Sequence, residues 1–537
     1  MQTILLSGIS VPVGTDVQAV YRQAEQKLKK MGVNTRPVRF GIYRRSVDAR
    51  KRHDVRLVYT VSITAEDGFL SEERAKALGL SILAEGAPLI RIGSQPLSHS
   101  PVVVGSGPCG LFAALLLAES GYAPIVLERG GDVRERAAAY TTLCQSHTID
   151  TETNIQFGIG GAGTFSDGKL VTRINDPMMG YVLSRFVEFG APEDILTQAK
   201  PHIGTDVLAE IVTRMVERIT ELGGRVLTHT ALLDFTERNG VVESVVTSRG
   251  TIPTDALILA IGHSARDTYK ALLSHPLSIE PKPFSVGMRI EHLTEDIDHA
   301  MYGSFAGHPD LGHAEYALSS NTKSRGVYTF CMCPGGEVVA ATSEEGGVVV
   351  NGMSNRARDG KNSNSAVVCS IFREDYGDTP LGAIEFARQI EQRAFLCSGS
   401  DYATPLTTVG DFLADRAPHA HPSRVLPTYM GGEHYRLASP DAYLPGFVVR
   451  EVRTALLDFD RRISGFAAPD AILSGAETRT SAPVRILRDN ESRLAIGYQN
   501  LFPSGEGAGY AGGITSAAID GIRTALALMG TYAPPTH

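Results

Sequence analysis

Long apolar runs are absent from this sequence of 537 residues. The longest purely apolar run is Leu111–Ala118, whereas a helix that crosses a membrane needs about 18 such residues. The first residues also lack the basic region and the cleavage site of a secretory signal. We therefore expect no membrane-spanning segment and no export from the cell.

Cysteine is scarce, and its spacing argues against several kinds of site. The six cysteines are Cys109, Cys144, Cys331, Cys333, Cys369 and Cys397, with no CxxC and no CxxxxC pair among them. This pattern indicates neither a disulfide framework nor a dithiol redox site, and it predicts a reducing, cytoplasmic environment. No His/Cys cluster completes a set of metal ligands, so no metal is expected. His419 and His421 are interpreted as part of a Pro-bounded loop.

Low-complexity stretches are missing too, and the composition is that of an ordinary globular protein with room for about three domains. Hydrophobic residues make up 43% and charged residues 20% of the chain, which argues against a filament or a disordered protein. The net charge of −8 is uneven, because residues 1–100 carry 15 Lys and Arg against 9 Asp and Glu. This asymmetry indicates a separate N-terminal module.

Hydrophobic periodicity divides the first hundred residues into six elements. It predicts strands at residues 3–9, 37–44, 55–64 and 88–92, and helices at residues 16–31 and 71–84. The order β-α-β-β-α-β is the split βαβ order of a ferredoxin-like α+β domain, which we place at residues 1–95. The module lacks the cysteines that an iron–sulfur cluster needs. A Ser- and Pro-rich linker follows at residues 93–101.

A glycine-rich turn lies where the pattern changes to alternating strands and helices. The buried strand Val102–Val104 runs into Gly105-Ser-Gly107-Pro108-Cys-Gly110, and an apolar helix follows. In this setting the first glycine permits a tight turn, the second lets the backbone approach a pyrophosphate, and the third lets helix and strand pack closely. The helix N-terminus attracts the phosphates. This arrangement predicts a dinucleotide-binding site.

A second strand supports this prediction. It covers residues 124–127 and ends in Glu128, 23 residues past Gly105, where an acid holds the ribose hydroxyls. Arg129 is assigned to the same site. Such an acid argues against a 2′-phosphate, so the ligand is NAD or FAD. Residues 158–163 also fit GxGxxG, but neither a buried strand nor a helix flanks them, and they are not interpreted as a second Rossmann turn.

Two later segments favour FAD over NAD. The strand at residues 255–261 ends in Gly262 and resembles the glycine-terminated strand behind the flavin in flavoproteins of the glutathione-reductase type. Residues 501–514 lead into a helix and resemble the distal flavin motif, in which a carboxylate contacts the ribityl region. That carboxylate is Glu506 here, where most relatives carry Asp. We therefore expect FAD as the cofactor.

Motifs along nearly the whole chain resemble the bacterial FAD-dependent dehydrogenases of uncharacterised substrate that carry an N-terminal ferredoxin-like domain. The matching stretches are residues 43–51, 102–110, 160–170, 259–268, 329–336, 477–485 and 505–519. The resemblance implies an α/β fold, with a Rossmann-type FAD-binding domain at residues 100–285 and 470–537 and an inserted mixed α/β substrate domain at residues 286–469. It also implies flavin contacts from Gly161, Gly163, Thr164, Ser166, Gly168, Lys169, Ala231, Ala260, Gly262, Gly505, Glu506, Gly513 and Ile514.

Two departures from neighbouring families narrow the chemistry. Flavin hydroxylases usually carry Asp-Gly where this chain has Asp255-Ala256, which disfavours hydroxylation. Disulfide reductases need a cysteine pair near the first helix, and Cys109 has no partner at that spacing. We expect an FAD oxidoreductase that transfers hydride between flavin N5 and a small molecule. Because the chain has one proper Rossmann motif, NAD(P)H as a reductant would visit the substrate cavity transiently.

Four residues are candidates for the reaction itself. Lys169 could stabilise reduced flavin, or merely neutralise phosphates or pair with Asp167. His263 follows a strand end and could relay a proton near neutral pH, although a structural histidine is the commoner case. Cys331 and Cys333 could supply a nucleophile or an acid, against the alternative of small buried hydrophobes on a strand. Guanidinium groups that could pair with a substrate carboxylate or with surface acids are those of Arg289, Arg479 and Arg485.

A binding function is the rival to catalysis. Basic side chains between residues 36 and 56 could dock an RNA, or they could be the solvated face of a hairpin, which is the commoner case. They are Arg36, Arg39, Arg44, Arg45, Arg50, Lys51, Arg52 and Arg56. Only Phe40, Tyr43 and Tyr59 accompany them, whereas RNA readers interleave aromatic with basic residues, so nucleic acid is disfavoured as a partner. A third hypothesis is a binding module whose FAD is purely structural.

Overall fold

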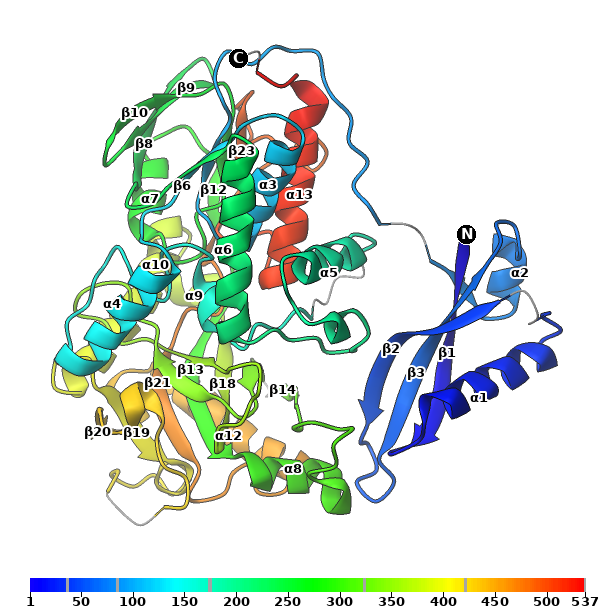
Figure 1. Cartoon of the computed structure of the whole chain (residues 1–537). Helices are drawn as coiled ribbons and strands as arrows, with labels where there is room; N and C mark the ends of the chain where they lie inside the picture. The colour runs from blue at the N-terminus through cyan, green and yellow to red at the C-terminus, as the bar shows by residue number, and fades with distance from the viewer. Residues whose placement is uncertain (35–37, 84–85, 172–175, 322–324, 420–422, 536–537) are drawn as a thin grey trace.

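The N-terminal module and the rest of the chain form two separate parts in the computed structural model, which describes residues 1–34, 38–83, 86–171, 176–321, 325–419 and 423–535. Figure 1 shows the module to one side of a larger body, with a long extended segment between them. The body contains a parallel sheet and a mixed sheet. Among the described residues, no helix has the length and apolar character needed to cross a bilayer.

The N-terminal module is an antiparallel sheet with two helices. Its elements are β1 (Gln2–Pro12), α1 (Val17–Lys30), β2 (Arg39–Asp48), β3 (Arg56–Ala65), α2 (Glu72–Ala77) and β4 (Ser81–Ile82), and the sheet order is β2-β3-β1-β4. Burial alternates along β3, so one face of the sheet packs on the helices. The element order is the one that the periodicity predicts.

The end of the module differs from the prediction. The second helix ends at Ala77 rather than at residue 84, because Gly79 takes a left-handed conformation with a φ of 68° just past the helix end. The last strand is β4, which lies inside the predicted helix and pairs with β1. Residues 88–92 form no strand, since the place beside β1 is already taken. The exposed apolar side chains of this segment are Leu89, Ile90 and Ile92.

A five-stranded parallel sheet forms the centre of the body, in the order β23-β11-β5-β6-β7. Its strands are β5 (Val102–Val104), β6 (Ile125–Leu127), β7 (Arg225–Leu227), β11 (Leu257–Leu259) and β23 (Leu501–Pro503). One face packs on α3 (Pro108–Glu119), α6 (Thr205–Glu221) and α13 (Ile514–Thr531). The other face packs on α7 (Arg266–Leu272) and on the sheet of β8 (Leu232–Arg238), β9 (Val241–Thr247) and β10 (Gly250–Pro253). Because both faces are covered, the central strands are apolar throughout.

A seven-stranded mixed sheet forms the other half of the body, in the order β14-β15-β18-β13-β21-β19-β20. Its strands are β13 (Phe284–Leu293), β14 (Ser319–Asn321), β15 (Gly326–Cys333), β18 (Asn362–Ile371), β19 (Thr404–Thr408), β20 (Tyr435–Leu437) and β21 (Ile472–Glu477). Helices α10 (Pro380–Cys397) and α12 (Gly446–Arg462) pack on these strands. The chain builds this sheet after β11 and then returns to the parallel sheet at β23.

Shorter elements join these layers. The helices are α4 (Val133–Ser146), α5 (Met179–Glu188), α8 (Thr294–Tyr302), α9 (Arg373–Tyr376) and α11 (Val409–Leu413), with a 3-10 turn at Ala162–Phe165. The strands are β12 (Ile279–Pro281), β16 (Glu337–Ala340), β17 (Val350–Met353) and β22 (Val484–Ile486). Pairing of β12 with β22 and of β16 with β17 gives two small antiparallel sheets.

The edge strand β2 connects the module to the body. The Arg45 N–H donates to the Thr197 carbonyl at 2.7 Å, and the Ala199 N–H donates to the Arg45 carbonyl at 2.8 Å. The Gly14 N–H donates to the Asp310 carboxylate at 3.0 Å. Residues 197–199 therefore pair with Arg45 at the free edge of β2.

Candidate functional site

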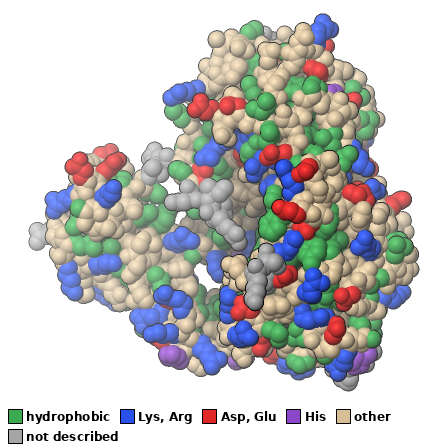
Figure 2. Space-filling view, turned by 180° about the vertical axis from the view of Figure 1, so that it is seen from behind, with side chains coloured by type: hydrophobic (Ala, Val, Ile, Leu, Met, Phe, Trp, Pro, Cys, Tyr) green, Lys and Arg blue, Asp and Glu red, His purple; other side chains and the backbone are tan. Residues whose placement is uncertain are grey.

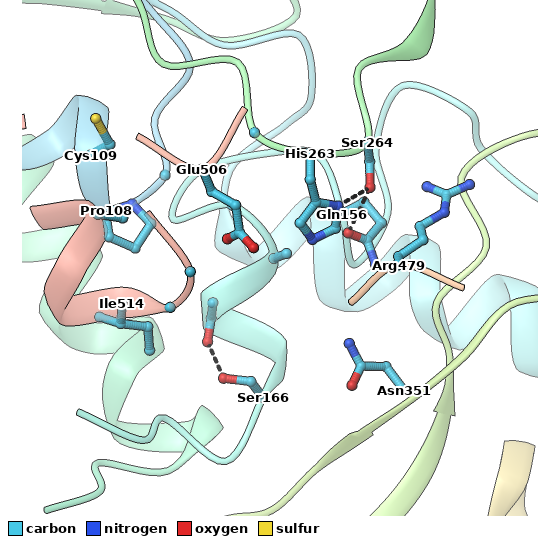
Figure 3. Close-up of a pocket in the computed structure, with 18 of the residues that line it drawn as sticks. Pro108, Cys109, Gln156, Ser166, His263, Ser264, Asn351, Arg479, Glu506 and Ile514 are labelled. Carbon is cyan, nitrogen blue, oxygen red and sulfur yellow. Dashed lines mark hydrogen bonds between the residues drawn. The ribbon is translucent and has the colours of Figure 1, made fainter. Parts of the chain in front are cut away.

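One large cavity, of about 440 Å³, lies between the carboxyl ends of the parallel strands and the mixed sheet (Figure 3). In α/β folds ligands bind at this end of the strands. The predicted site residues in its lining are Gly105, Gly107, Pro108, Glu128, Arg129, Gly161, Gly163, Ser166, Lys169, Ala231, Ala260, Gly262, His263, Cys331, Cys333, Glu506, Gly513 and Ile514. The predicted residues outside the lining are Gly110, Thr164, Gly168 and Gly505.

The glycines of the first turn have different local roles. Gly105 has a φ of 98°, and a Cβ there would lie 2.2 Å from the Ala260 carbonyl oxygen. A Cβ at Gly110 would lie 1.8 Å from the Gly105 carbonyl oxygen, so this glycine allows helix α3 to pack against the turn. Gly107 has the ordinary φ of −68°, and the nearest atom to a Cβ there is the Gly161 Cα at 4.0 Å. The absence of a side chain at Gly107 therefore leaves space in the cavity, and it is not needed to relieve backbone strain.

The Glu128 carboxylate is already bound by the protein. One oxygen accepts the Ser106 hydroxyl at 2.6 Å and the Ser106 N–H at 3.0 Å. The other accepts the N–H groups of Gly130 and Gly158 at 3.1 and 2.9 Å. The acid predicted to hold a ribose thus also joins three backbone segments.

The loop after α4 faces the glycine turn across the cavity. Gly161, with a φ of 61°, begins the 3-10 turn, and a Cβ there would lie 3.0 Å from the Gly107 Cα. The Ser166 hydroxyl donates to the Gly163 carbonyl at 2.7 Å (Figure 3). Gly168 has a φ of 66° and packs against the Gly204 backbone. This loop therefore presents backbone rather than bulky side chains to the turn.

The N-terminus of α13 and Glu506 form another wall. No heavy atom lies within 4 Å of a Cβ built at Gly512 or Gly513, so the backbone there is open to a ligand. Figure 3 shows Glu506 pointing into the cavity. Burial raises the pKa of Glu506 to about 7, against the opposing effects of Lys282 and the Gly513 N–H. This carboxyl therefore changes charge near neutral pH.

Lys169 belongs to a buried group of charges. Its Nζ lies 3.2 Å from an Asp167 oxygen, and Arg358 pairs with both Asp167 and Glu315. Burial opposes the charged form, but the Asp167 and Glu315 carboxylates outweigh it and raise the pKa of Lys169. The Nζ makes no hydrogen bond to the residues that the structure describes. Lys169 is therefore a cation that both pairs with Asp167 and faces the cavity.

His263 is neutral at physiological pH. Its Nδ1 lies 2.9 Å from the Ser264 hydroxyl, which lies 3.1 Å from the Gln156 Oε1 (Figure 3). Burial, together with the cations Arg479 and Arg266, lowers the pKa of His263 to about 3, against the opposing effect of the Glu391 carboxylate. This environment does not favour the proton relay near neutral pH that the sequence suggested.

The two cysteines lie where β15 breaks its pairing with β18. Cys331 has a φ of 43° and its side chain is exposed to the cavity, whereas Cys333 is buried. Desolvation of the thiol raises the pKa of Cys331 to about 12, and it also raises the pKa of Cys333. The positive charge of Arg289 opposes this effect at both cysteines. Both thiols are therefore neutral at physiological pH. This favours the interpretation of the two cysteines as small hydrophobic groups over that of a thiolate nucleophile.

The three candidate arginines have different environments. Arg289 is fully buried, lies outside the cavity lining and pairs with Glu477 at 3.0 Å, so of the two alternatives the structure places an acid of the protein beside its guanidinium. Its Nη2 donates to the Cys331 carbonyl at 2.5 Å. Arg485 lies outside the cavity lining and donates to the Gly509 carbonyl at 3.4 Å. Arg479 lines the cavity, although Ser343 and Glu391 contact its guanidinium.

Several cavity residues were not found by sequence reasoning. Ser264 directly follows His263 in the chain and Gln156 lies two residues before the glycine-rich stretch 158–163, and these positions were the signal that the sequence offered. No sequence pattern points to Asn351 or Glu315, which reach the cavity from strand β17 and from the loop before β14. Thr480, also in the lining, lies in the stretch 477–485 that carries the family resemblance, but the sequence assigned it no role.

One cluster of metal-ligand residues occurs in the described part of the chain. Ligand atoms of His147, Asp401 and His434 lie within 4.8 Å of one another. The two imidazole rings are stacked, 3.6 Å apart and 17° from parallel, so their lone pairs do not converge on one ion. His419 contacts Asp411 at 3.1 Å, and His421 lies outside the described residues.

Comparisons with known proteins agree with this geometry. Residues 283–480 match the model of the family "FAD-dependent protein, C-terminal domain-like", and residues 103–166 match an NAD(P)-binding Rossmann-like domain. A Clostridium beijerinckii protein called "Uncharacterized protein" is 43% identical over 529 residues, covering 97% of this chain and 98% of its own length.

Some similarity to solved structures is also found. CtdE in complex with FAD is 12% identical (80% of this chain, 84% of that chain, TM-score 0.31). L-amino acid deaminase from Proteus vulgaris is 14% identical (84% and 98%, TM-score 0.33), and glycine oxidase from Bacillus cereus is 10% identical (81% and 98%, TM-score 0.33). On the strength of the 43% identical relative and the family match, this chain belongs to a family of FAD-dependent proteins.

Proposed function

We propose that this protein is an FAD-dependent oxidoreductase that transfers hydride between a small-molecule substrate and N5 of the flavin. The observation that carries the proposal is that one cavity joins three things: the glycine turn before α3, the open N-terminus of α13 and a wall from the mixed sheet. A dinucleotide needs the first two, and a substrate needs room beside the third.

The residues present fit a bound FAD. The facing backbones of Gly107 and Gly161 leave space that two side chains would fill, and the N-terminus of α3 favours phosphate there. Glu128 lies where it would meet the adenosine ribose, with its hydrogen bonds to Ser106 shared or exchanged. Glu506 and the open backbone at Gly513 would meet the ribityl chain and the pyrimidine edge of the ring.

Bound FAD would supply the hydride acceptor or donor. Lys169 keeps its positive charge in the cavity, and the N-terminus of α13 adds a partial positive charge, so both favour negative charge on a ligand. The opposite wall carries Cys331, Asn351 and Arg479. We propose that the substrate binds against this wall, and that NAD(P)H, if it is the reductant, enters by the same route.

The N-terminal part is proposed to be a ferredoxin-like module with no role in nucleic acid binding. Three of its basic side chains lie beside acids of the chain: Arg45 is 4.0 Å from Asp310, and Arg50 and Arg56 pair with Asp48 and Asp54. Figure 2 shows Lys and Arg side chains at several separate places on the visible face of the module. These observations do not favour the RNA-acting alternative.

The first experiment is to identify the flavin and then to reduce it. Protein purified in the dark should release FAD on acid treatment, and Gly107→Ala protein should release none. The holoenzyme is then mixed anaerobically with NADH or NADPH in a stopped-flow instrument, and the flavin band at about 450 nm is followed. Bleaching by either nucleotide would establish a nicotinamide-dependent reductase. Absence of FAD from the wild-type protein, and failure to bind added FAD, would overturn the proposal.

A further inference from the structure

We infer that His263 is held as the neutral Nδ1–H tautomer, and that its Nε2 is a fixed hydrogen-bond acceptor for a ligand O–H or N–H group in the cavity. This inference deepens the proposed function, because it states what chemical group the ligand must present at this position. It rests on where each proton can be placed along a chain of hydrogen bonds from a backbone carbonyl to the imidazole.

The chain begins at the Ala341 carbonyl, which can only accept a hydrogen bond. Gln156 therefore directs its amide nitrogen to this oxygen, at 3.3 Å, and that contact fixes the orientation of the amide. The Gln156 Oε1 then faces the Ser264 hydroxyl at 3.1 Å. The buried Oε1 can only accept, and no other described donor reaches it, so a Ser264 proton directed to His263 would leave this oxygen without a hydrogen bond. The single hydroxyl proton of Ser264 is therefore directed to Gln156, which satisfies both contacts.

The position of the imidazole proton follows. The Ser264 oxygen has already used its proton, so at the 2.9 Å contact with His263 it must accept. The donor is therefore Nδ1–H. A neutral imidazole carries one N–H, which leaves the lone pair on Nε2.

A doubly protonated ring would also satisfy Ser264, but the surrounding charges oppose it. Arg479 and Arg266 both raise the cost of a positive charge on His263, and the Glu391 carboxylate that faces them is bound to both. Burial acts in the same direction and lowers the pKa of His263. The imidazole thus stays neutral, with one donor used by the protein and one acceptor left for a ligand.

Nε2 faces the cavity. His263 belongs to the lining, and Figure 3 shows that the ring nitrogen opposite the Ser264 contact faces the open space near Glu506. Among the described residues, the His263 ring makes its hydrogen bond through Nδ1, and none is made through Nε2. A ligand hydroxyl or amine next to Nε2 can donate a hydrogen bond to it. A carbonyl or carboxylate oxygen at the same place would be repelled by the Nε2 lone pair.

The first test measures the tautomer directly in the full-length chain, without relying on bound FAD. Protein labelled with 15N-histidine is examined by long-range 1H–15N correlation between about pH 5.5 and 8.5, a window around the ordinary histidine pKa, and the His263 signals are assigned by their loss in His263→Gln. We expect a protonated Nδ1 and an unprotonated Nε2 throughout. Ser264→Ala, which removes the partner of Nδ1–H but keeps the imidazole, should give a mixture of tautomers. An Nε2–H tautomer, or titration within this range, would overturn the inference.

The second test identifies the donor. FAD is added to the apoprotein: a ribityl hydroxyl at Nε2 would shift the Nε2 signal, and His263→Phe would then weaken FAD binding on the order of 10- to 100-fold. If FAD leaves the signal unchanged, holoprotein is titrated with 2-propanol and acetone, which match in size but differ in the hydroxyl proton. A shift with 2-propanol alone assigns the donor to the substrate.

Two results of this test would contradict the inference: equal shifts with both solvents, or no shift with FAD and 2-propanol alike. Failure of FAD to bind at all would contradict the proposed function instead, while the tautomer measurement would still stand. The two hypotheses therefore fail in different experiments.

Discussion

The Ser106 hydroxyl donates a 2.6 Å hydrogen bond to the Glu128 carboxylate, and the N–H of the same serine donates to the same oxygen at 3.0 Å. Gly130 and Gly158 bind the other oxygen. Each oxygen thus accepts two donors from the protein itself. Glu128, which the sequence assigns to ligand binding, therefore also joins three segments of the chain. These are the glycine turn, the segment after β6 and the loop near residue 158.

Glu128→Gln should destabilise the protein even without FAD. The amide nitrogen would face N–H donors where an acceptor is needed, and an unsatisfied buried donor costs about 1–3 kcal/mol. We expect a lower melting temperature for the apoprotein by several degrees. Glu152→Gln is the matched control, because Glu152 is exposed and pairs only with Arg129 in the described contacts. An unchanged melting temperature with lost FAD binding would show that Glu128 acts on the ligand alone.

Gly107→Ala and Gly110→Ala should separate binding from folding. The methyl group at position 107 would have its nearest neighbour at 4.0 Å, so the fold tolerates it but the approach of a pyrophosphate is blocked. The methyl group at position 110 would lie 1.8 Å from a carbonyl oxygen, so helix α3 must shift.

These two variants are compared by thermal melting and by flavin content. Gly107→Ala should melt near the wild-type apoprotein and contain no FAD, while Gly110→Ala should melt well below it. Normal FAD content in Gly107→Ala would mean that the dinucleotide does not pass close to this turn.

Local patterns were sufficient to predict the central elements. The strand Val102–Val104, the glycine turn and helix α3 follow one another in the chain. The strand is apolar throughout because both faces of the parallel sheet are buried. The end of the N-terminal module was not predicted correctly because residues 81–82 and 88–92 both have strand character. Competition for the edge of β1 decides between them, and that is a tertiary effect.

The candidate site shows the same division. Gly105, Gly107 and Glu506 stand in motifs whose spacing carries meaning, and the structure places them in one cavity. The partner of Asp167 could not be predicted, since Arg358 comes from a distant part of the sequence and meets it only after the mixed sheet forms. Likewise, the role of Arg289 depends on Glu477, which lies on a neighbouring strand.

Cys331 should react slowly with alkylating reagents. A thiol whose pKa is about 12 has a thiolate fraction at pH 8.5 that is on the order of 1,000-fold below that of an unperturbed cysteine. We expect iodoacetamide to label Cys331 at least about 100-fold more slowly than glutathione. Labelling is measured at the peptide level by mass spectrometry, with Cys331→Ser as the assignment control. A rate comparable to that of glutathione would indicate a thiolate and revive the nucleophile hypothesis.

Glu506→Gln should stabilise the FAD-free protein at high pH but not at low pH. The pKa of Glu506 is about 7 in the folded chain against an ordinary value of 4.5. Between these two values the folded state holds a proton that the unfolded state has released, so wild-type stability falls as pH rises through this window and is level above it. Glutamine is neutral at every pH and avoids this loss.

The gain in the Glu506→Gln variant should approach zero near pH 4.5 and reach about 3 kcal/mol above pH 7, since the two pKa values are 4.5 and about 7 and one pKa unit corresponds to about 1.4 kcal/mol. Thermal melting of wild-type and variant apoprotein at pH 5 and pH 8 measures it. The exposed Glu491 provides the control, because Glu491→Gln should change the melting temperature equally little at both pH values. A variant that is less stable than wild type at pH 8 would show that Lys282 and the Gly513 N–H stabilise the carboxylate more than burial destabilises it, so that the pKa of Glu506 is not raised.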